Sequence, residues 1–174
     1  LEQGYVGYSI VAFDEAGFRL VPVYRRVWFF KGEKPKGVFF WSNKKLEIFG
    51  ALIDGKKLFY EFYDSLNSLT FKAFLSDFIE SLPKRKRFIF LLDNASYHKT
   101  APIMNYLSKF SRIKVEFFPP YSPELNPTET CWKIIRANVT NSTYYPNLDS
   151  MQEGIENFLD GHFFMLNLPN YLCR

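Results

Sequence analysis

Two acidic residues of this chain follow apolar, strand-like runs, and a third stands at a predicted helix start. Asp14 and Asp93 each follow such a run, Glu129 closes the segment Asn-Pro-Thr-Glu, and 35 residues lie between Asp93 and Glu129. Hard divalent cations such as Mg²⁺ bind carboxylate oxygens, and two such ions about 3.5–4 Å apart can promote displacement at a phosphodiester. The three carboxylates therefore predict a divalent-metal site for phosphodiester chemistry.

Each of these carboxylates also has a purely structural explanation. Asn126 is a good helix N-cap, Pro127 suits the first helical position, and Glu129 at the third position nearly completes a capping box. Taken alone, Glu129 is therefore better explained as a capping residue than as a catalytic one. Asp14 and Asp93 can each begin a turn after a strand. The two explanations of Glu129 are compatible, because the cap would hold its carboxylate at the rim of the core.

Other polar residues near the three carboxylates compete with them or support them. Strand alternation predicts that Glu15 points to the opposite face from Asp14, and Glu124 lies in a loop, so Glu129 is the preferred third acid. His98 lies near a predicted helix start. It is predicted to hydrogen-bond a metal-binding carboxylate or to contact a phosphate, and a local hydrogen bond at the helix start is the alternative. Asn94 is assigned the same supporting role.

The composition indicates one well-packed domain over residues 1–174 and does not fit a disordered chain. Hydrophobic residues make up 47% and aromatic residues 20%, the net charge is +4, and the pI is near 9.0. Basic residues concentrate between positions 24 and 45, which predicts a region that faces phosphates. No membrane-helix pattern or signal peptide is visible. The two cysteines form no CxxC pair and are interpreted as reduced thiols of an intracellular protein.

The pattern of apolar residues predicts the elements that must position these side chains. Strands are expected at 5–14, 46–53, 58–63, 87–93 and 113–118, with helices at about 70–82, 99–110, 126–138 and 148–159. Asp54-Gly55 is a hairpin turn signal, and the basic segment before it could form a hairpin of 20–30 with 38–41. If the first strand lies beside 87–93 in a mixed sheet, their aspartates meet at one edge, where open α/β sheets bind ligands.

Three motifs carry a resemblance to a known family. The segments 14–18 (Asp-Glu-Ala-Gly-Phe), 92–98 (Leu-Asp-Asn-Ala-Ser-Tyr-His) and 119–129 (Pro-Pro-Tyr-Ser-Pro-Glu-Leu-Asn-Pro-Thr-Glu), followed by Trp132, resemble the DDE catalytic domain of IS630/Tc1/mariner-type transposases. The resemblance implies an α/β, RNase H-like fold. Its mixed five-stranded sheet is flanked by helices and carries a basic insertion after the first strand.

The resemblance also implies an activity. Asp14, Asp93 and Glu129 would form a catalytic triad that binds two Mg²⁺ ions, with Mn²⁺ as a substitute. The enzyme would cleave double-stranded DNA at transposon terminal repeats and join the 3′-OH to target DNA, typically at TA, as a homodimer in the cytoplasm and nucleoid, or in the nucleus of a eukaryote. The spacing of 35 is one residue longer than the commonest in the family. We also expect that the helix-turn-helix region that normally precedes this domain is missing from this sequence.

Basic and aromatic residues predict where DNA would bind. The segment 25–32 interleaves the two types, which suits phosphate contact and base stacking, although a solvated edge hairpin with a buried Trp28 is an equal alternative. The segment 84–87 is interpreted as a solvated loop in preference to a DNA contact. The residues predicted to bind DNA are Arg25, Arg26, Trp28, Lys31, Lys34, Lys133 and Arg136.

Two other functions compete with an active transposase. The first is a catalytically inactive remnant that still binds DNA or dimerises, which would have no reason to keep a complete triad. The second is another RNase H-like nuclease, acting on an RNA–DNA hybrid, against which the motif at 119–129 argues.

Overall fold

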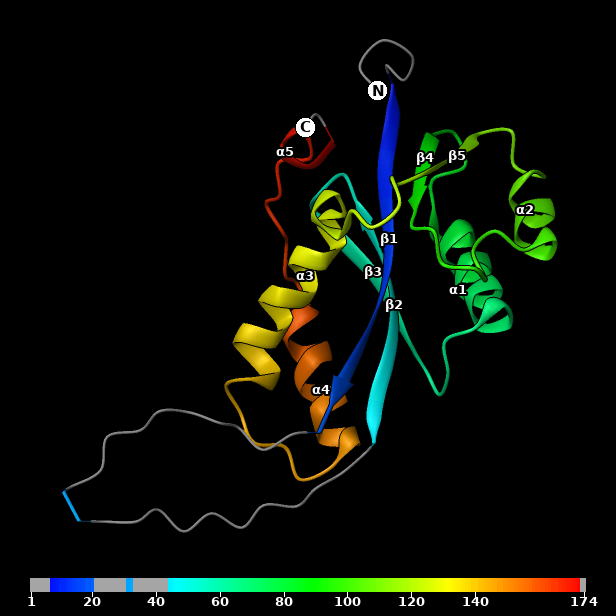
Figure 1. Cartoon of the computed structure of the whole chain (residues 1–174). Coiled ribbons are helices and arrows are strands. Elements are labelled where there is room, and N and C mark those ends of the chain that lie inside the picture. Colours follow the sequence, from blue (N-terminus) through cyan, green and yellow to red (C-terminus); the bar gives the residue numbers. More distant parts are fainter. Residues whose placement is uncertain (1–6, 21–30, 33–43, 173–174) are drawn as a thin grey trace.

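The structure, a computed structural model, describes residues 7–20, 31–32 and 44–172. Five strands form one sheet in the order β3-β2-β1-β4-β5 (Figure 1). The strands are β1 (Tyr8–Arg19), β2 (Lys45–Ile53), β3 (Lys57–Tyr63), β4 (Arg87–Leu92) and β5 (Ile113–Phe117). The helices are α1 (Ser68–Ser81), α2 (Ala101–Leu107), α3 (Pro127–Ile135), α4 (Leu148–Leu159) and α5 (Pro169–Leu172).

The sheet is mixed, as predicted. β1 pairs antiparallel with β2 and parallel with β4, and β4 pairs parallel with β5. The β2–β3 hairpin closes at Asp54 and Gly55, both of which have positive φ (50° and 70°), as a tight hairpin turn requires. The Asp54 carboxylate also accepts a hydrogen bond from the Ile10 N–H at 2.8 Å, which ties the turn to β1.

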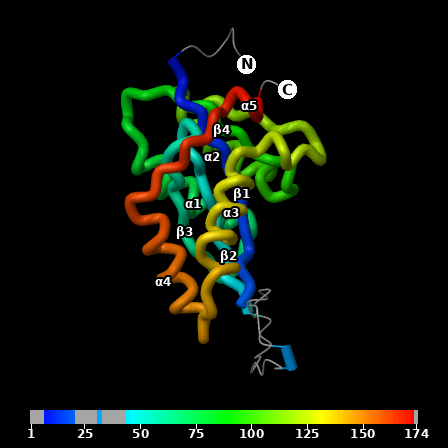
Figure 2. The backbone as a smooth tube through the Cα atoms, turned by 90° about the vertical axis from the view of Figure 1, so that its left-hand side faces the viewer, coloured from blue at the N-terminus to red at the C-terminus, as the bar shows by residue number. Residues whose placement is uncertain are grey.

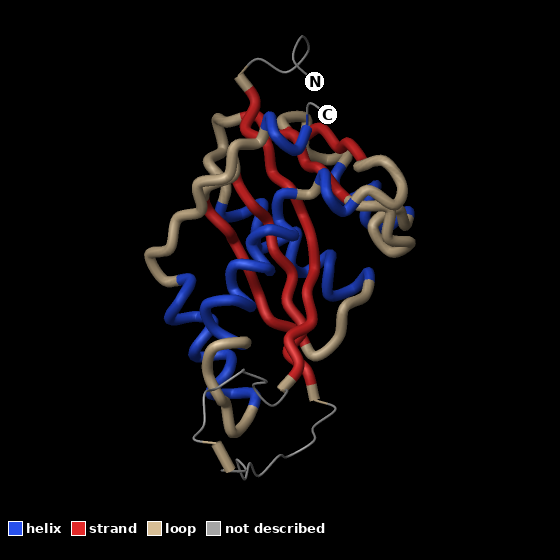
Figure 3. The backbone as a smooth tube through the Cα atoms, turned by 60° about the vertical axis from the view of Figure 1, so that its left-hand side comes forward, coloured by secondary structure: helices blue, strands red, loops and turns tan. Residues whose placement is uncertain are grey.

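Helices cover both faces of the sheet, and the strands run between them (Figure 3). α1 and α2 pack on one face, where Phe13 of β1 makes edge-to-face contacts with Phe71, Phe74 and Phe78 of α1. α3 and α4 pack on the other face and lie in front of the strands in Figure 2. Because Val11, Ala12 and Phe13 of β1 are buried on both faces of the sheet, this stretch is continuously apolar instead of alternating.

The strand that carries Asp14 is longer than predicted. β1 does not end at Asp14 but continues to Arg19, paired with β2 throughout. The extension is stabilised by burial of Ala16 and Phe18 against the α3 and α4 face. β4 ends at Leu92, so the edge next to Asp14 is created by the end of β4 and not by the end of β1.

The predicted helices and loops match with shifts of a few residues. The helix expected at 99–110 is shorter, at Ala101–Leu107, and α3 continues into a π-helical turn at Arg136–Thr140. The predicted hairpin of 20–30 with 38–41 lies largely outside the described residues. Within the described part of the chain, no helix is long and apolar enough to cross a membrane.

Candidate active site

The Asn-Pro-Thr-Glu segment fastens the start of α3 to β1. The Asn126 side chain caps the helix by accepting from the Thr128 N–H at 3.1 Å, and its Nδ2 donates to the Phe13 carbonyl at 3.0 Å. The Thr128 hydroxyl donates to the neighbouring Ala12 carbonyl at 2.8 Å. Both side chains are buried, so the cap predicted from sequence is also a cross-link to the sheet. Glu129 therefore has a fixed place relative to β1.

Trp132 holds the carboxylate of Asp14. Its indole Nε1 donates to Asp14 Oδ2 at 2.8 Å, and both residues are buried. Asp14 is paired with Gly50 on β2, and a Cβ on Gly50 would lie 2.6 Å from the Trp132 ring. The glycine is therefore what lets the indole lie against the sheet. The sequence singles out Trp132 as the residue that follows the 119–129 motif and does not predict this role, although a buried indole N–H usually has an acceptor.

Asp93, the first residue after β4, is held from the other side. Its Oδ1 accepts from the Ala95 N–H at 2.9 Å and lies 2.6 Å from His98 Nδ1. The His98 ring is 1% exposed and packs between Phe71 and Tyr97, with ring centroids 4.2 and 4.4 Å away. His98 is thus in direct contact with the aspartate that it is predicted to support.

Asn94 fixes the loop next to Asp93 and does not contact its carboxylate in any described hydrogen bond. Its Nδ2 donates to the Phe118 carbonyl at 2.6 Å, and its Oδ1 accepts from the Lys99 ammonium. Phe118 immediately precedes the proline-rich segment 119–123. Asn94 therefore connects the two loops that follow β4 and β5.

The Glu15 carboxylate lies close to both aspartates, so the expectation that its place on the opposite face from Asp14 keeps it out of the site is wrong. Asp14, Glu15 and Asp93 each have a carboxylate oxygen within 4.8 Å of the others. Glu15 lies two residues after Phe13, so its side chain leaves β1 on the face that α1 covers. Because β4 has already ended beside this part of β1, no neighbouring strand separates that face from the one that carries Asp14. Beside it, His98 Nε2 is buried without a hydrogen-bond partner among the described residues. Tyr97 Oη and Glu15 Oε2 are also buried and make no hydrogen bond of good geometry there, although the two side chains lie close enough to shift each other's pKa.

The crowding of these acids changes their pKa values. Burial, together with the charges of Glu129 and Glu15, raises the pKa of Asp14 to about 8, although the Trp132 hydrogen bond opposes the shift. Burial likewise raises the pKa of Glu15. Burial also acts to raise the pKa of Asp93, but the hydrogen bonds from His98 and Ala95 and the nearby positive charges outweigh it and hold that pKa below its usual value.

The three predicted carboxylates share one cleft. Asp14, Asp93 and Glu129 line a cleft of 360 Å³ together with the proline-rich segment 119–123. The alternative third acid, Glu124, is exposed and is not among the residues that line this cleft. The clustered carboxylates are those of Asp14, Glu15 and Asp93, of which Asp14 has a strongly raised pKa. Such a cluster suits a hard divalent cation, which would offset the mutual repulsion of the carboxylates.

Comparison with known proteins assigns this site to a family. A family model described as DDE superfamily endonuclease matches residues 9–152. The chain belongs to the DDE superfamily of endonucleases. It is 32% identical over 113 residues to the Tc3 transposable-element transposase of Caenorhabditis elegans, covering 62% of this chain and 34% of that protein. It is 23% identical over 148 residues to a 39 kDa protein of insertion element IS630 from Shigella sonnei, covering 84% and 43%.

Solved structures agree with this assignment at the level of the fold. The Mos1 strand transfer complex superposes with a TM-score of 0.70 at 19% identity, covering 94% of this chain and 49% of that chain. The Mos1 transposase catalytic domain with raltegravir and Mg gives 0.65 at 16% identity, covering 98% and 78%. The predicted IS630/Tc1/mariner membership and RNase H-like fold are confirmed. This DDE domain spans less than half the length of the two relatives that it matches in sequence.

Tyr121 of this DDE domain is a feature that sequence analysis missed. It lies on the cleft, its side chain is entirely exposed (101%), and its φ is +56°. A residue with a Cβ in this left-handed region carries a conformational cost of about 1–2 kcal/mol. A tyrosine between Pro120 and Ser122 in a proline-rich motif signals a stiff loop, but nothing in the motif shows the direction of the ring.

Of the predicted DNA-binding residues, the three that the structure describes do not line the cleft. Lys133 is exposed on α3, and Arg136 lies over the Phe18 ring at 5.0 Å and donates to the Gly17 carbonyl at 3.4 Å. Lys31 is exposed, and the other four predicted residues (Arg25, Arg26, Trp28 and Lys34) fall outside the described residues. DNA binding by these seven residues stays a prediction.

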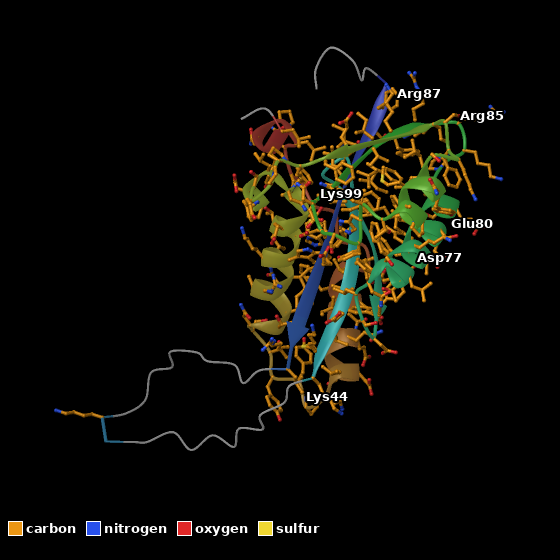
Figure 4. All side chains as sticks on the ribbon, turned by 45° about the vertical axis from the view of Figure 1, so that its right-hand side comes forward. Lys44, Asp77, Glu80, Arg85, Arg87 and Lys99 are labelled. Atoms are coloured by element: carbon orange, nitrogen blue, oxygen red, sulfur yellow. The ribbon has the colours of Figure 1, made fainter. Side chains whose placement is uncertain are left out.

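The basic loop 84–87 lies at the far end of β4 from Asp93. Figure 4 shows Arg85 and Arg87 at the end of the sheet where β1 and β4 begin. Lys99, by contrast, hydrogen-bonds Asn94, one of the residues that line the cleft. The Arg87 guanidinium lies over the Tyr8 ring, 4.5 Å from its centroid. The loop is exposed and does not line the cleft.

Proposed function

We propose that this DDE domain cleaves DNA at transposon ends and joins the freed 3′-OH to target DNA in a divalent-metal-dependent reaction. The proposal rests on the meeting of Asp14, Asp93 and Glu129 at one cleft, from β1, the loop after β4, and α3. The family supports it, because the relatives include a transposase and the Mos1 structures include a strand transfer complex and a paired-end complex with Mg.

The same three carboxylates would hold two Mg²⁺ ions, with Mn²⁺ as a substitute. Their oxygens are the ligands that these cations prefer. The raised pKa of Asp14 reflects its burial and, after that, the negative charges of Glu129 and Glu15, whose repulsion a cation would relieve. When bound, the ions would stabilise charge on the attacking and leaving oxygens of the phosphodiester.

The residues of the chain itself supply position and orientation. Trp132 fixes the Asp14 carboxylate, the Ala95 N–H and His98 fix that of Asp93, and the capped start of α3 presents Glu129. The three acids therefore come from different elements but are each fixed in place, and the reacting phosphate would be aligned by groups that need little rearrangement.

A nicking assay with variants tests this function. We expect the 174-residue chain to nick supercoiled plasmid in Mg²⁺ or Mn²⁺ but not in EDTA, and Asp93→Ala to lower the rate by at least about 10²-fold. Glu129→Gln should act in the same direction. Glu124→Gln is the matched control, because it changes an exposed acid outside the cleft. Joining of a 3′-OH oligonucleotide to plasmid, with sequenced junctions, tests strand transfer and the preference for TA.

The same assays separate the alternatives. Nicking that survives Asp93→Ala would overturn the mechanism. DNA binding without any metal-dependent cleavage by the wild-type chain would favour the inactive remnant. Cleavage confined to the RNA strand of an RNA–DNA hybrid would favour another RNase H-like nuclease.

The partners proposed with this function are double-stranded transposon ends and target DNA, bound by a homodimer inside the cell. Membership of a DNA transposase group supports the DNA partner. Sedimentation of the chain with and without terminal-repeat DNA tests the dimer, and a monomer on DNA would contradict it.

A further inference from the structure

We propose that Tyr121 is a stacking platform for a nucleobase of the DNA strand that enters the active-site cleft. The inference rests on the proposed function, because it takes DNA to be the ligand of the cleft. It adds a binding site for a base to a site so far described only by its carboxylates.

The side chain of Tyr121 does nothing for the fold that the structure shows. Its ring is entirely exposed and belongs to none of the hydrophobic clusters of the described residues. Five large hydrophobic side chains are exposed in the described part of the chain, and Tyr121 alone among them lines the cleft; the others are Leu69, Tyr144, Phe163 and Met165. The exposed ring is therefore located where a substrate would be bound.

The backbone of Tyr121 is strained in a way that the local sequence does not require. Asp54, the other non-glycine residue with positive φ in the described part of the chain, sits in a hairpin turn that imposes this conformation. Tyr121 lies in no such hairpin, and a glycine there would carry no strain. Strained conformations that the surroundings maintain are concentrated at binding and catalytic sites.

The loop that carries Tyr121 is stiff, so the ring is held ready to bind. Prolines stand at 119, 120 and 123, and both ends of the segment are fastened. Asn94 donates to the Phe118 carbonyl at 2.6 Å, and the Leu125 N–H donates to the Ser122 carbonyl at 3.1 Å. A ligand that stacks on a ring already held in place loses less conformational entropy than one that must order it.

The chemistry of the loop selects a base over a phosphate. Residues 119–127 contain no lysine or arginine, and their one charged residue is the acid Glu124. A neutral aromatic ring offers little to a phosphate, whereas every base has a π-face that can stack on it regardless of sequence. With the phosphate taken by the carboxylates and their cations, a neighbouring base is the part of the strand that fits Tyr121.

A fluorescence experiment tests this site. The probe is a single-stranded oligonucleotide of mixed sequence with 2-aminopurine at one position, bound to the 174-residue chain in Ca²⁺. We expect wild-type binding to quench the 2-aminopurine at one or two neighbouring positions. Tyr121→Ala should abolish the quenching and weaken binding by about 5- to 140-fold, and Tyr121→Phe should retain both.

Two further variants make the result independent of folding. Tyr144→Ala removes an exposed tyrosine outside the cleft and should leave quenching and affinity unchanged. Tyr121→Gly relieves the positive φ, so it should melt at or above the wild-type temperature and still lose the quenching. Equal quenching by wild type and Tyr121→Ala, or loss in Tyr121→Phe, would overturn the inference.

Failure of this inference is distinguishable from failure of the proposed function. A chain that cleaves DNA in Mg²⁺ but shows no quenching dependent on Tyr121 would lose only the stacking site. A chain that shows this quenching but never cleaves DNA would lose the catalytic function and keep the base-binding site.

Discussion

The active-site edge has two sides that are built differently. On the α3 side, Asn126, Thr128 and Trp132 bind β1 and Asp14 through hydrogen bonds between buried groups. On the other side, called the β4 side here, Tyr97, His98 and Glu15 of β1 surround Asp93, and each has a buried polar atom that makes no hydrogen bond of good geometry with the described residues. The buried polar groups named on the α3 side are hydrogen-bonded, whereas those named on the β4 side lack hydrogen bonds of good geometry.

This difference separates the parts of the site that hold the fold from those that await a ligand. A buried polar atom without a good hydrogen bond costs about 1–3 kcal/mol, so three such atoms close together lower the stability of the fold. Such groups in native proteins usually have a catalytic role or bind a water or an ion. We therefore expect changes on the α3 side to act mainly on stability, and changes on the β4 side mainly on activity.

The largest effect is expected from Trp132→Ala on the α3 side. The indole is fully buried in the cluster with Ile135 and Phe18, and its loss leaves a cavity and removes the Asp14 hydrogen bond. We expect the free energy of unfolding, measured in urea, to fall by about 3–5 kcal/mol. Lys133→Ala on the exposed face of the same helix is the control, with a change within about 0.5 kcal/mol. Equal effects of the two changes would contradict the scaffold role.

The next prediction concerns how folding stability depends on pH. Asp14 accepts a hydrogen bond from the α3 side, but its pKa is strongly raised. Its folded-state pKa is about 8 and its unfolded value 3.8, so between these values the folded state binds a proton that the unfolded state does not. Its contribution to stability is therefore complete below about pH 4 and is lost as the pH rises toward 8.

Thermal unfolding in EDTA checks this dependence. We expect the melting temperature of the wild-type chain to fall between pH 5 and pH 8, and Asp14→Asn to flatten the curve, since the amide oxygen still accepts from Trp132. Added Mg²⁺ should restore stability at pH 8 in the wild type but not in the variant. An Asp14→Asn curve parallel to that of the wild type would show that Asp14 does not titrate in this range.

A smaller effect is expected from Gly50→Ala, which disturbs the α3 side through its partner strand. The added Cβ would lie 2.6 Å from the Trp132 ring, so the indole or the backbone must shift. We expect a loss of about 1–3 kcal/mol in the free energy of unfolding. Gly17→Ala on β1 is the matched control, because its Cβ would meet only the Lys45 side chain, at 3.6 Å. If Gly17→Ala lowers the free energy of unfolding as much as Gly50→Ala does, the loss at Gly50 is not caused by contact with the indole.

The two sides also differ in how far the sequence predicts them. The cap at Asn126 and the placement of Glu129 follow from a local motif, and the structure contains both. The bond from Trp132 to Asp14 joins residues 118 apart in sequence, so no local pattern indicates it. The position of the Glu15 carboxylate depends on where β4 ends beside β1, which alternation along a single strand cannot show.

The smallest effect on stability is expected from Glu15→Gln on the β4 side. Burial raises the pKa of Glu15, so the neutral amide is no worse buried, and its N–H groups could serve Tyr97 Oη or His98 Nε2. We expect the free energy of unfolding to change by less than about 0.5 kcal/mol.

The affinity for Mn²⁺, measured by calorimetry, should nevertheless weaken by about 10- to 100-fold in Glu15→Gln, with the nicking rate following it. Thr128→Val is the matched change on the α3 side. It removes the hydrogen bond to Ala12 and should lower stability by about 1 kcal/mol while Mn²⁺ affinity is preserved. If Glu15→Gln loses stability and keeps Mn²⁺, the buried polar atoms of the β4 side belong to the scaffold, and the division of the site into two sides is wrong.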